Sequence, residues 1–206
     1  MDLQARQTLP AESLQSPLAL ELARLREENS MLKSSLERLE GLAYRDALTG
    51  LRNRRYFDER LDEEVARLRR TGAEALSVIL VDLDGFKNIN DARGHAAGDQ
   101  ALTWISEFLR AHVRFTDACC RMGGDEFVLL LPETGAEGCA IVAALLRRRI
   151  DERLAAGEAP VGFSLGCATS RRSEEPCELI ARADSAMYTD KRERARPPMR
   201  IASFAA

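Results

Sequence analysis

Residues 117–131, Asp-Ala-Cys-Cys-Arg-Met-Gly-Gly-Asp-Glu-Phe-Val-Leu-Leu-Leu, predict a β-hairpin. The pair Gly123-Gly124 permits a tight reversal of the chain and lets a ligand approach the backbone. Two carboxylates, Asp125 and Glu126, follow the glycines at once. Because consecutive side chains of an extended chain point to opposite faces, we expect only one of these carboxylates to meet a given partner on a neighbouring strand.

Helices and strands alternate on both sides of this hairpin. Apolar periodicity marks the helices, and short apolar runs mark the strands. Strands interleaved with helices around one tight hairpin predict an α+β sandwich with βαββαβ order. The expected elements are helices over about 58–70, 98–113, 135–155 and 175–194, strands over 76–81 and 161–168, and hairpin strands over 117–121 and 127–131.

The composition limits the class of protein. The chain has 206 residues, of which 45% are hydrophobic, enough for one packed domain with an appendage. The net charge of -3, from 30 basic and 33 acidic residues, argues against a nucleic-acid or membrane partner. The chain has no apolar run of membrane-spanning length and no signal-peptide order at its amino terminus, so we expect a cytoplasmic protein. The five cysteines lack CxxC spacing, which favours structural thiols.

An amino-terminal segment has the spacing of a coiled coil. Residues 1–17 contain two prolines and little apolar periodicity, so we expect a flexible tail there. Over 18–43, seam residues recur in alternating steps of four and three, the heptad spacing of a coiled coil. The alternative is a single amphipathic helix packed on its own domain. The expected d positions are Leu18, Leu25, Leu32 and Leu39, and the expected a positions are Leu22, Asn29, Leu36 and Ala43.

Charged residues beside this seam favour a parallel pair of chains. In a parallel pair each g position faces the e position of the next heptad on the partner. Glu21 would then face Arg26, and Glu28 would face Lys33. A single polar residue at an a position, here Asn29, costs stability but favours two strands in register. We therefore expect a homodimer formed through this helix.

Acidic residues also follow the first predicted strand. Asp82 comes directly after the apolar run and before Leu83-Asp84-Gly85-Phe86-Lys87. A strand that ends in acidic residues and a glycine is a common place for a metal-bound phosphate. If this strand and the hairpin are neighbours, Asp82 and Asp125 converge. Two carboxylates and a backbone carbonyl, completed by water and phosphate oxygens, suit magnesium. The alternative is that Asp125 and Glu126 only decorate an exposed turn.

Several longer motifs occur in order along the chain, which is far more specific than one short pattern. They are the hairpin 123–127, 46–55 (Asp-Ala-Leu-Thr-Gly-Leu-Arg-Asn-Arg-Arg), 82–91 (Asp-Leu-Asp-Gly-Phe-Lys-Asn-Ile-Asn-Asp), Gly94-His95 and Gly98-Asp99. In these motifs the chain resembles the GGDEF-domain diguanylate cyclases over nearly all of residues 44–203. The resemblance implies a ferredoxin-like fold of the nucleotide-cyclase or palm-like type and a catalytic domain over 44–206.

The resemblance also implies a reaction across a homodimer. Each subunit would hold one GTP, and two 3'-5' phosphodiester bonds would join them into cyclic di-GMP with release of two pyrophosphates. By similarity, Asp82, the carbonyl of Leu83 and Asp125 would hold two magnesium ions per GTP, with manganese as an alternative. Asp125, or the metal that it holds, would also help to deprotonate the attacking 3'-hydroxyl, as in other two-metal transfer reactions. The implied catalytic residues are Asp125, Glu126 and Lys87, and the role of Glu126 stays open.

Other motif positions would bind the nucleotide. Asn90 and Asp99 match the positions that recognise the guanine edge, and a carboxylate can accept from the N1–H and amine of guanine, a pair that adenine does not offer. His95 lies in the same loop and would either contact the nucleotide or hold the loop by a hydrogen bond. The phosphates would lie against the amides around Gly85 and Phe86, the glycine turn at Gly123, and the ammonium groups of Lys87 and Lys191.

The region after Lys191 departs from the family pattern. Many relatives have a stretch containing glycine and then an arginine four residues after this lysine. Here the run is Arg192-Glu193-Arg194-Ala195-Arg196. Arg194 or Arg196 would replace the phosphate contact, or would only cover the end of a helix.

Arg114 and Asp117 have the RxxD spacing of the family's inhibitory site, where arginine and aspartate bind guanines of the product. The alternative is an ordinary surface ion pair. If the site works, cyclic di-GMP is both product and inhibitor. Two other functions stay open: a catalytically silent module that senses cyclic di-GMP through this site, and a scaffold whose role is the coiled coil alone. The sequence does not identify what regulates the protein.

Overall fold

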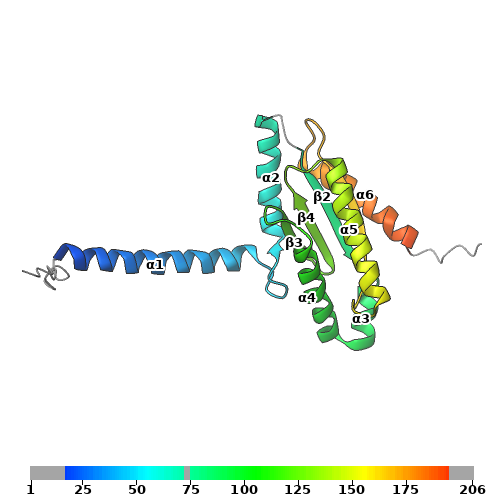
Figure 1. Ribbon diagram of the computed structural model, residues 1–206, viewed down its shortest axis with the longest axis horizontal. Helices are drawn as coiled ribbons and strands as arrows, with labels where there is room; N and C mark the ends of the chain where they lie inside the picture. The colour runs from blue at the N-terminus through cyan, green and yellow to red at the C-terminus, as the bar shows by residue number, and fades with distance from the viewer. Residues whose placement is uncertain (1–16, 72–74, 195–206) are drawn as a thin grey trace, which may run out of the picture. The chain divides into compact units, whose positions relative to one another are not determined.

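The protein, in this computed structural model, is described over residues 17–71 and 75–194. The chain forms two compact units that divide between Ala43 and Tyr44, and each is described by itself (Figure 1). The predicted flexible tail lies outside the described residues, apart from Pro17, which begins the first helix.

The amino-terminal unit is formed by the helix α1, Pro17–Tyr44. The leucines of the expected seam are exposed in the single chain, and Leu32, Leu36 and Leu39 each have an exposed fraction of 59%. Burying one leucine stabilises a protein by about 1.5–3 kcal/mol, so a row of uncovered leucines favours association. The predicted helix is confirmed, and its pairing with a second copy stays a prediction.

The second unit contains one five-stranded sheet in the order β1-β3-β4-β2-β5. β1 pairs with β3 in parallel, and all other neighbours are antiparallel. The succession β2, helices, β3, β4, α5, β5 in this strand order is the predicted βαββαβ arrangement. None of the helices in the described part of the chain has the length and apolar composition needed to cross a membrane. The elements are β1 (Arg52–Asn53), α2 (Arg54–Thr71), β2 (Ser77–Leu83), α3 (Phe86–Arg93), α4 (His95–Ala111), β3 (Ala118–Gly123), β4 (Glu126–Leu131), α5 (Ala136–Ala155), β5 (Phe163–Thr169) and α6 (Pro176–Arg194).

Helices cover both faces of this sheet, as Figure 1 shows. Side chains alternate along each strand, so the sheet has two apolar faces and the unit has two cores. One core joins Ile79, Val81 and Phe127 to α4 and α5. The other core joins Val78 and Val128 to α2 and α6. The second unit therefore has one central sheet between two layers of helices.

Two helical segments differ from the sequence prediction. The helix expected to start near Asp58 begins at Arg54, directly after the two residues of β1, which apolar periodicity could not reveal. The helix expected over 98–113 begins at His95, and a separate short helix, α3, precedes it. Gly94 separates them with φ 79°, a left-handed backbone value that interrupts a helix.

Asp82 lies within strand β2, whereas we expected it to follow the strand. The strand extends to Leu83 because β2 is paired on both sides: Asp82 lies opposite Glu126 of β4 and opposite Ser164 of β5. Pairing on two sides keeps a polar residue extended where its intrinsic preference would end the strand.

Candidate active site

A lysine of α6 binds an aspartate of β2. Nζ of Lys191 lies 2.5 Å from Oδ1 of Asp82. The hydrogen bond to Asp82 raises the pKa of Lys191, although burial opposes the rise. The negative charges of Asp125 and Asp84 raise this pKa further. The carboxylates at this end of β2 therefore form one negative centre that already holds a cation.

The hairpin brings both of its carboxylates to the same end of β2. Gly124 (φ 55°) and Asp125 form the two-residue turn, and Glu126 begins β4. Glu126 is the direct cross-strand neighbour of Asp82, so their side chains lie on one face of the sheet. The backbone N–H of Leu83 donates to the carbonyl oxygen of Asp125 at 3.3 Å. The expectation that the first strand and the hairpin are neighbours is confirmed, and the register decides that Glu126 is the residue opposite Asp82.

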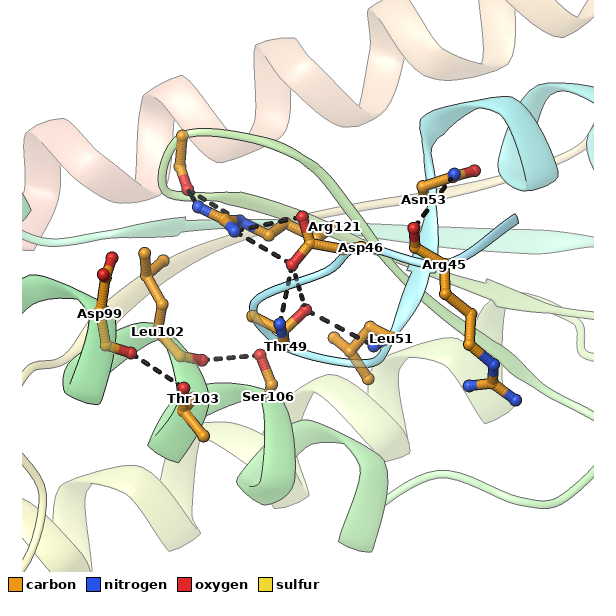
Figure 2. A network of polar contacts seen from close by, with 11 residues as sticks. Arg45, Asp46, Thr49, Leu51, Asn53, Asp99, Leu102, Thr103, Ser106 and Arg121 are labelled. Carbon is orange, nitrogen blue, oxygen red and sulfur yellow. Dashed lines mark hydrogen bonds and ion pairs between the residues drawn. The ribbon is translucent and has the colours of Figure 1, made fainter. Parts of the chain in front are cut away.

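Arg121, to which the sequence assigned no role, binds the backbone of this turn (Figure 2). Its Nη2 and Nε donate to the carbonyl oxygen of Gly124 at 2.8 and 3.1 Å. Its Nη1 donates to both carboxylate oxygens of Asp46 at 3.0 and 3.2 Å. Arg121 therefore joins the hairpin turn to the segment that follows α1 in the chain.

Asp46 is the other end of this link. It accepts from the backbone N–H of Thr49 at 2.9 Å and from the Thr49 hydroxyl at 2.7 Å (Figure 2). Burial alone would raise the pKa of Asp46, but these hydrogen bonds and the Arg121 guanidinium more than offset burial and hold the pKa below its usual value. Both residues lie in motifs that the sequence singled out, yet nothing in the sequence indicates that they touch.

The predicted guanine-binding residues lie where α3 and α4 meet. A Cβ at Gly98 would collide with the side-chain amide of Asn90, so the absence of a side chain lets Asn90 lie against the first turn of α4. Asp99 follows at once, and its side chain is exposed. Its backbone carbonyl accepts from the Thr103 hydroxyl at 2.9 Å (Figure 2). Asn90 and Asp99 thus lie at one helix junction, as a shared site requires.

Four other predicted nucleotide contacts lie at or directly before the beginnings of helices, whereas Gly123 is the last residue of β3, with φ 138°. Gly85, with φ 70°, precedes α3, and Phe86 and Lys87 are its first residues. Lys87 is exposed, and His95 is exposed as the first residue of α4. Backbone N–H groups in the first turn of a helix are free to bind anions, which suits these positions to a phosphate.

Asp84 is a further acidic residue of the site that the prediction left without a role. Its Oδ1 accepts from the Ser164 hydroxyl at 2.6 Å, and its Oδ2 accepts from Nε of Arg194 at 3.1 Å. Arg194 therefore pairs with a carboxylate in this structure, whereas we had considered it for a phosphate contact or a helix-end cover. The other candidate, Arg196, lies outside the described residues.

The RxxD residues form the turn between α4 and β3. The backbone N–H of Arg114 donates to Oδ2 of Asp117 at 2.8 Å, and the N–H of Asp117 donates to the Arg114 carbonyl at 3.1 Å. Burial raises the pKa of Asp117, and the Arg114 amide partly opposes the rise. Between them Phe115 is fully exposed, at 105%. Arg114 thus contacts Asp117 through its backbone and not through a side-chain ion pair, and the inhibitory role stays a prediction.

The residues present fit a magnesium ion only together with a nucleotide. The part of the chain that the structure describes contains no group of three His, Cys, Asp or Glu side chains placed to hold a metal. Two carboxylates and the Leu83 carbonyl would leave half of an octahedron to phosphate and water oxygens, as is usual for magnesium on a nucleotide. The carboxylate of Asp82 already binds a positive group, Lys191, at this place.

The chain matches the family model for the GGDEF domain of diguanylate cyclases over residues 43–196. It is 37% identical over 166 residues to the response regulator PleD of Caulobacter vibrioides, covering 78% of this chain and 36% of PleD. It is 36% identical over 193 residues to the diguanylate cyclase TpbB of Pseudomonas aeruginosa, covering 88% of this chain and 41% of TpbB. The chain thus spans less than half the length of each of these two relatives.

Solved structures give the same result. The coiled coil and GGDEF domain of DgcB from Caulobacter crescentus, in complex with cyclic di-GMP, superposes with a TM-score of 0.74 at 28% identity, covering 86% of this chain and 96% of that one. The diguanylate cyclase SiaD of Pseudomonas aeruginosa, in complex with its activator SiaC, superposes with a TM-score of 0.69 at 34% identity, covering 84% of this chain and 68% of that one.

Proposed function

Because the chain belongs to the family of GGDEF-domain diguanylate cyclases, we propose that it joins two GTP molecules into cyclic di-GMP and releases two pyrophosphates. Each copy in a homodimer supplies one half-site. The observation that carries the proposal is the contact of Lys191 with Asp82 beside the Gly124-Asp125 turn. In this contact a cation that can bind phosphate lies beside carboxylates that can bind a metal. Transfer of a nucleotidyl group requires both kinds of group at one site.

The nucleotide is held at both of its ends. The Asp99 carboxylate accepts from the N1–H and amine of guanine, and Asn90 completes recognition of that edge with its amide. Lys87 and the amides of the first turn of α3 donate to the phosphates. On binding, Lys191 exchanges the Asp82 carboxylate for phosphate oxygens, so one ion pair replaces another.

The Asp125 carboxylate accepts the proton of the attacking 3'-hydroxyl. Magnesium or manganese, bound to Asp82, the Leu83 carbonyl and Asp125, would neutralise the triphosphate and polarise the α-phosphorus. Glu126 lies opposite Asp82 in the strand register and adds negative charge at this point. We assign Asp125 the direct role because it occupies the hairpin turn and its carbonyl accepts from the N–H of Leu83, and we assign Glu126 a supporting one.

A homodimer and product inhibition complete the proposal. A parallel coiled coil of α1 brings two half-sites together, since neither can close both phosphodiester bonds alone. Cyclic di-GMP binds at Arg114 and Asp117 and inhibits the enzyme when the product accumulates. The proposal includes a cytoplasmic location, where GTP is available, and no nucleic-acid or membrane partner.

The proposed function is tested by incubating the protein with GTP, with ATP and with both, in magnesium or manganese, and identifying products by mass spectrometry. We expect cyclic di-GMP from GTP alone and none from ATP alone. Asp125→Ala should abolish the product, with a loss of at least about a thousandfold because a metal ligand and proton acceptor disappear together. Absence of product from a folded wild-type dimer would contradict the proposal.

The silent-receptor alternative is not favoured. Its expected mark is a damaged signature hairpin, and residues 123–127 are intact here. The same incubation separates the two functions, because a receptor binds cyclic di-GMP without forming it.

A further inference from the structure

β5 forms one edge of the sheet, and α6 lies directly against it. Within residues 17–71 and 75–194, β5 is the last strand in the sheet order and pairs with β2 alone. A Cβ at Gly166 would collide with the α6 backbone at Ala183 and Met187, so the helix and the strand touch through their main chains. The outer N–H and C=O groups of an edge strand need partners from other parts of the protein.

Two charged side chains supply such partners. Oδ2 of Asp190, on α6, accepts from the backbone N–H of Leu165 at 2.7 Å. Nη1 of Arg147, on α5, donates to the backbone carbonyl of Phe163 at 2.6 Å. Arg147 and Asp190 also form an ion pair with each other. Together they bind the edge of β5 as a neighbouring strand would.

This pair also joins the two faces of the sheet. α5 packs in the core formed with Ile79 and Val81, whereas α6 packs in the core formed with Val78. The Arg147–Asp190 pair therefore passes around the edge of the sheet from one helix to the other. Both side chains are mostly covered, with exposed fractions of 23% and 27%, so solvent screens the pair less than an ordinary surface ion pair.

We propose that Asp190 and Arg147 are positioning residues that hold Lys191 in the nucleotide site, an inference that rests on the proposed phosphate role of Lys191. Asp190 directly precedes Lys191, and the described helix ends three residues further on, at Arg194. The last turn of a helix lacks part of its hydrogen bonding and frays. The Arg147–Asp190 pair, which we call the clamp, anchors that turn to β5 and α5 immediately before Lys191.

The chain offers a matched control at the other end of the same helix. Nη2 of Arg182 donates to the carbonyl of Thr169, also on β5, at 2.6 Å, and Arg182 pairs with Glu174. Arg182 thus ties α6 to β5 just as Arg147 and Asp190 do, but more than two turns before Lys191. Loosening that contact should destabilise the protein without moving the lysine.

The test compares Asp190→Ala and Arg147→Met with Arg182→Met in the full chain without nucleotide. The rate at which an amine-reactive acylating reagent labels Lys191 is measured by peptide mass spectrometry. We expect labelling to be several-fold faster in Asp190→Ala and Arg147→Met, because the lysine leaves Asp82 more often. Arg182→Met should label at the wild-type rate. Asp190→Asn, which keeps an acceptor for Leu165, should be intermediate.

A second measurement connects the clamp to the nucleotide site. Binding of inorganic triphosphate, followed by calorimetry, should be about tenfold weaker in Asp190→Ala, the scale of one charged hydrogen bond, and unchanged in Arg182→Met. In turnover, KM for GTP should rise more than kcat falls. If Asp190→Ala does not fold, the labelling rate of Lys191 and the affinity for triphosphate are compared between Arg147→Met and Arg182→Met.

Two results would overturn the clamp: wild-type labelling of Lys191 in folded Asp190→Ala, or equal acceleration in Arg182→Met, which would indicate general loosening of α6. Failure of the proposed function is recognised separately, because the labelling rates do not require catalysis. A wild-type protein that forms no cyclic di-GMP, yet labels Lys191 faster in Asp190→Ala, would refute the function and keep the clamp.

Discussion

At the scale of single residues, Asp46 shows how a carboxylate far from the site in sequence supports it. Its two oxygens accept four hydrogen bonds in all, two from Thr49 and two from Arg121. Arg121, whose side chain is only 12% exposed, passes the contact on to the Gly124 carbonyl. The conformation of the turn that carries Asp125 therefore depends on a charge pair outside the catalytic motif.

Asp46→Asn should lower the free energy of unfolding at neutral pH by about 1–3 kcal/mol, because it leaves a largely covered guanidinium with a weakened partner. The folded-state pKa of Asp46 lies below its ordinary value of 3.8. Its stabilising contribution is therefore present above that value and is lost as the pH falls through the lower folded-state pKa. Urea denaturation of wild type and variant should show a difference that shrinks in acid.

The control is Asp62→Asn, on the exposed surface of α2, which should change little at either pH. A difference for Asp46→Asn that stays constant from neutral to acid pH would contradict the assignment of the effect to its charge.

Gly98 gives a second residue-scale prediction. Alanine normally favours a helix over glycine by about 1 kcal/mol. Here the added Cβ collides with Asn90, so we expect Gly98→Ala to displace that side chain and to raise KM for GTP about tenfold, the scale of one recognition contact. The measurement is steady-state kinetics with GTP. Gly135→Ala is the matched control, since among the described residues a Cβ there meets Ala75 at an ordinary 3.8 Å. An equal effect in both variants would count against a role for Asn90.

At the scale of elements, the turn between α4 and β3 carries Arg114 and Asp117. The turn is closed by its own backbone and by the Asp117 carboxylate, so its shape does not depend on the Arg114 side chain. That side chain is exposed and available to a ligand.

Arg114→Ala should therefore keep the fold and relieve inhibition by cyclic di-GMP. We expect the product concentration that halves the initial rate to rise at least about tenfold, because a two-point hydrogen bond from arginine to guanine is lost. Initial rates with added product measure it. Arg110→Ala, an exposed arginine one turn earlier, is the control. Unchanged inhibition in Arg114→Ala would remove the inhibitory role.

At the scale of the whole molecule, the proposal depends on pairing of the helix α1 with α1 of a second copy. In the single chain, Leu32 of the expected seam and its neighbour Met31 are equally exposed, at 59% and 60%. Only pairing of two helices distinguishes them, because Leu32 takes a seam position and Met31 does not.

Leu32→Asp should therefore shift the protein to monomer and reduce turnover at dilute concentration, while Met31→Asp should leave both unchanged. Analytical ultracentrifugation gives the mass, and product formation across protein concentrations gives the turnover. Deletion of residues 1–40 should act like Leu32→Asp. Equal behaviour of the two aspartate variants would mean that α1 does not pair through the predicted seam.

Much of the fold could be predicted because its signals are local. The hairpin, β2, α5, β5 and α6 were all expected near their observed bounds, since periodicity and glycines mark them along the chain. β1 and α3 could not be found in this way: a two-residue strand exists only through its pairing with β3, and α3 is too short for a clear apolar period.

The sequence by itself determined the family and predicted a set of nucleotide residues, because those residues stand in contiguous motifs whose spacing needs no fold to recognise. Only the tertiary structure decided which groups meet. Lys191 contacts Asp82 across 109 positions, Arg121 contacts Asp46 across 75, and Arg147 contacts Asp190 across 43. Such contacts follow from strand register and from helices packed on two faces of one sheet, and no local pattern in the chain records them.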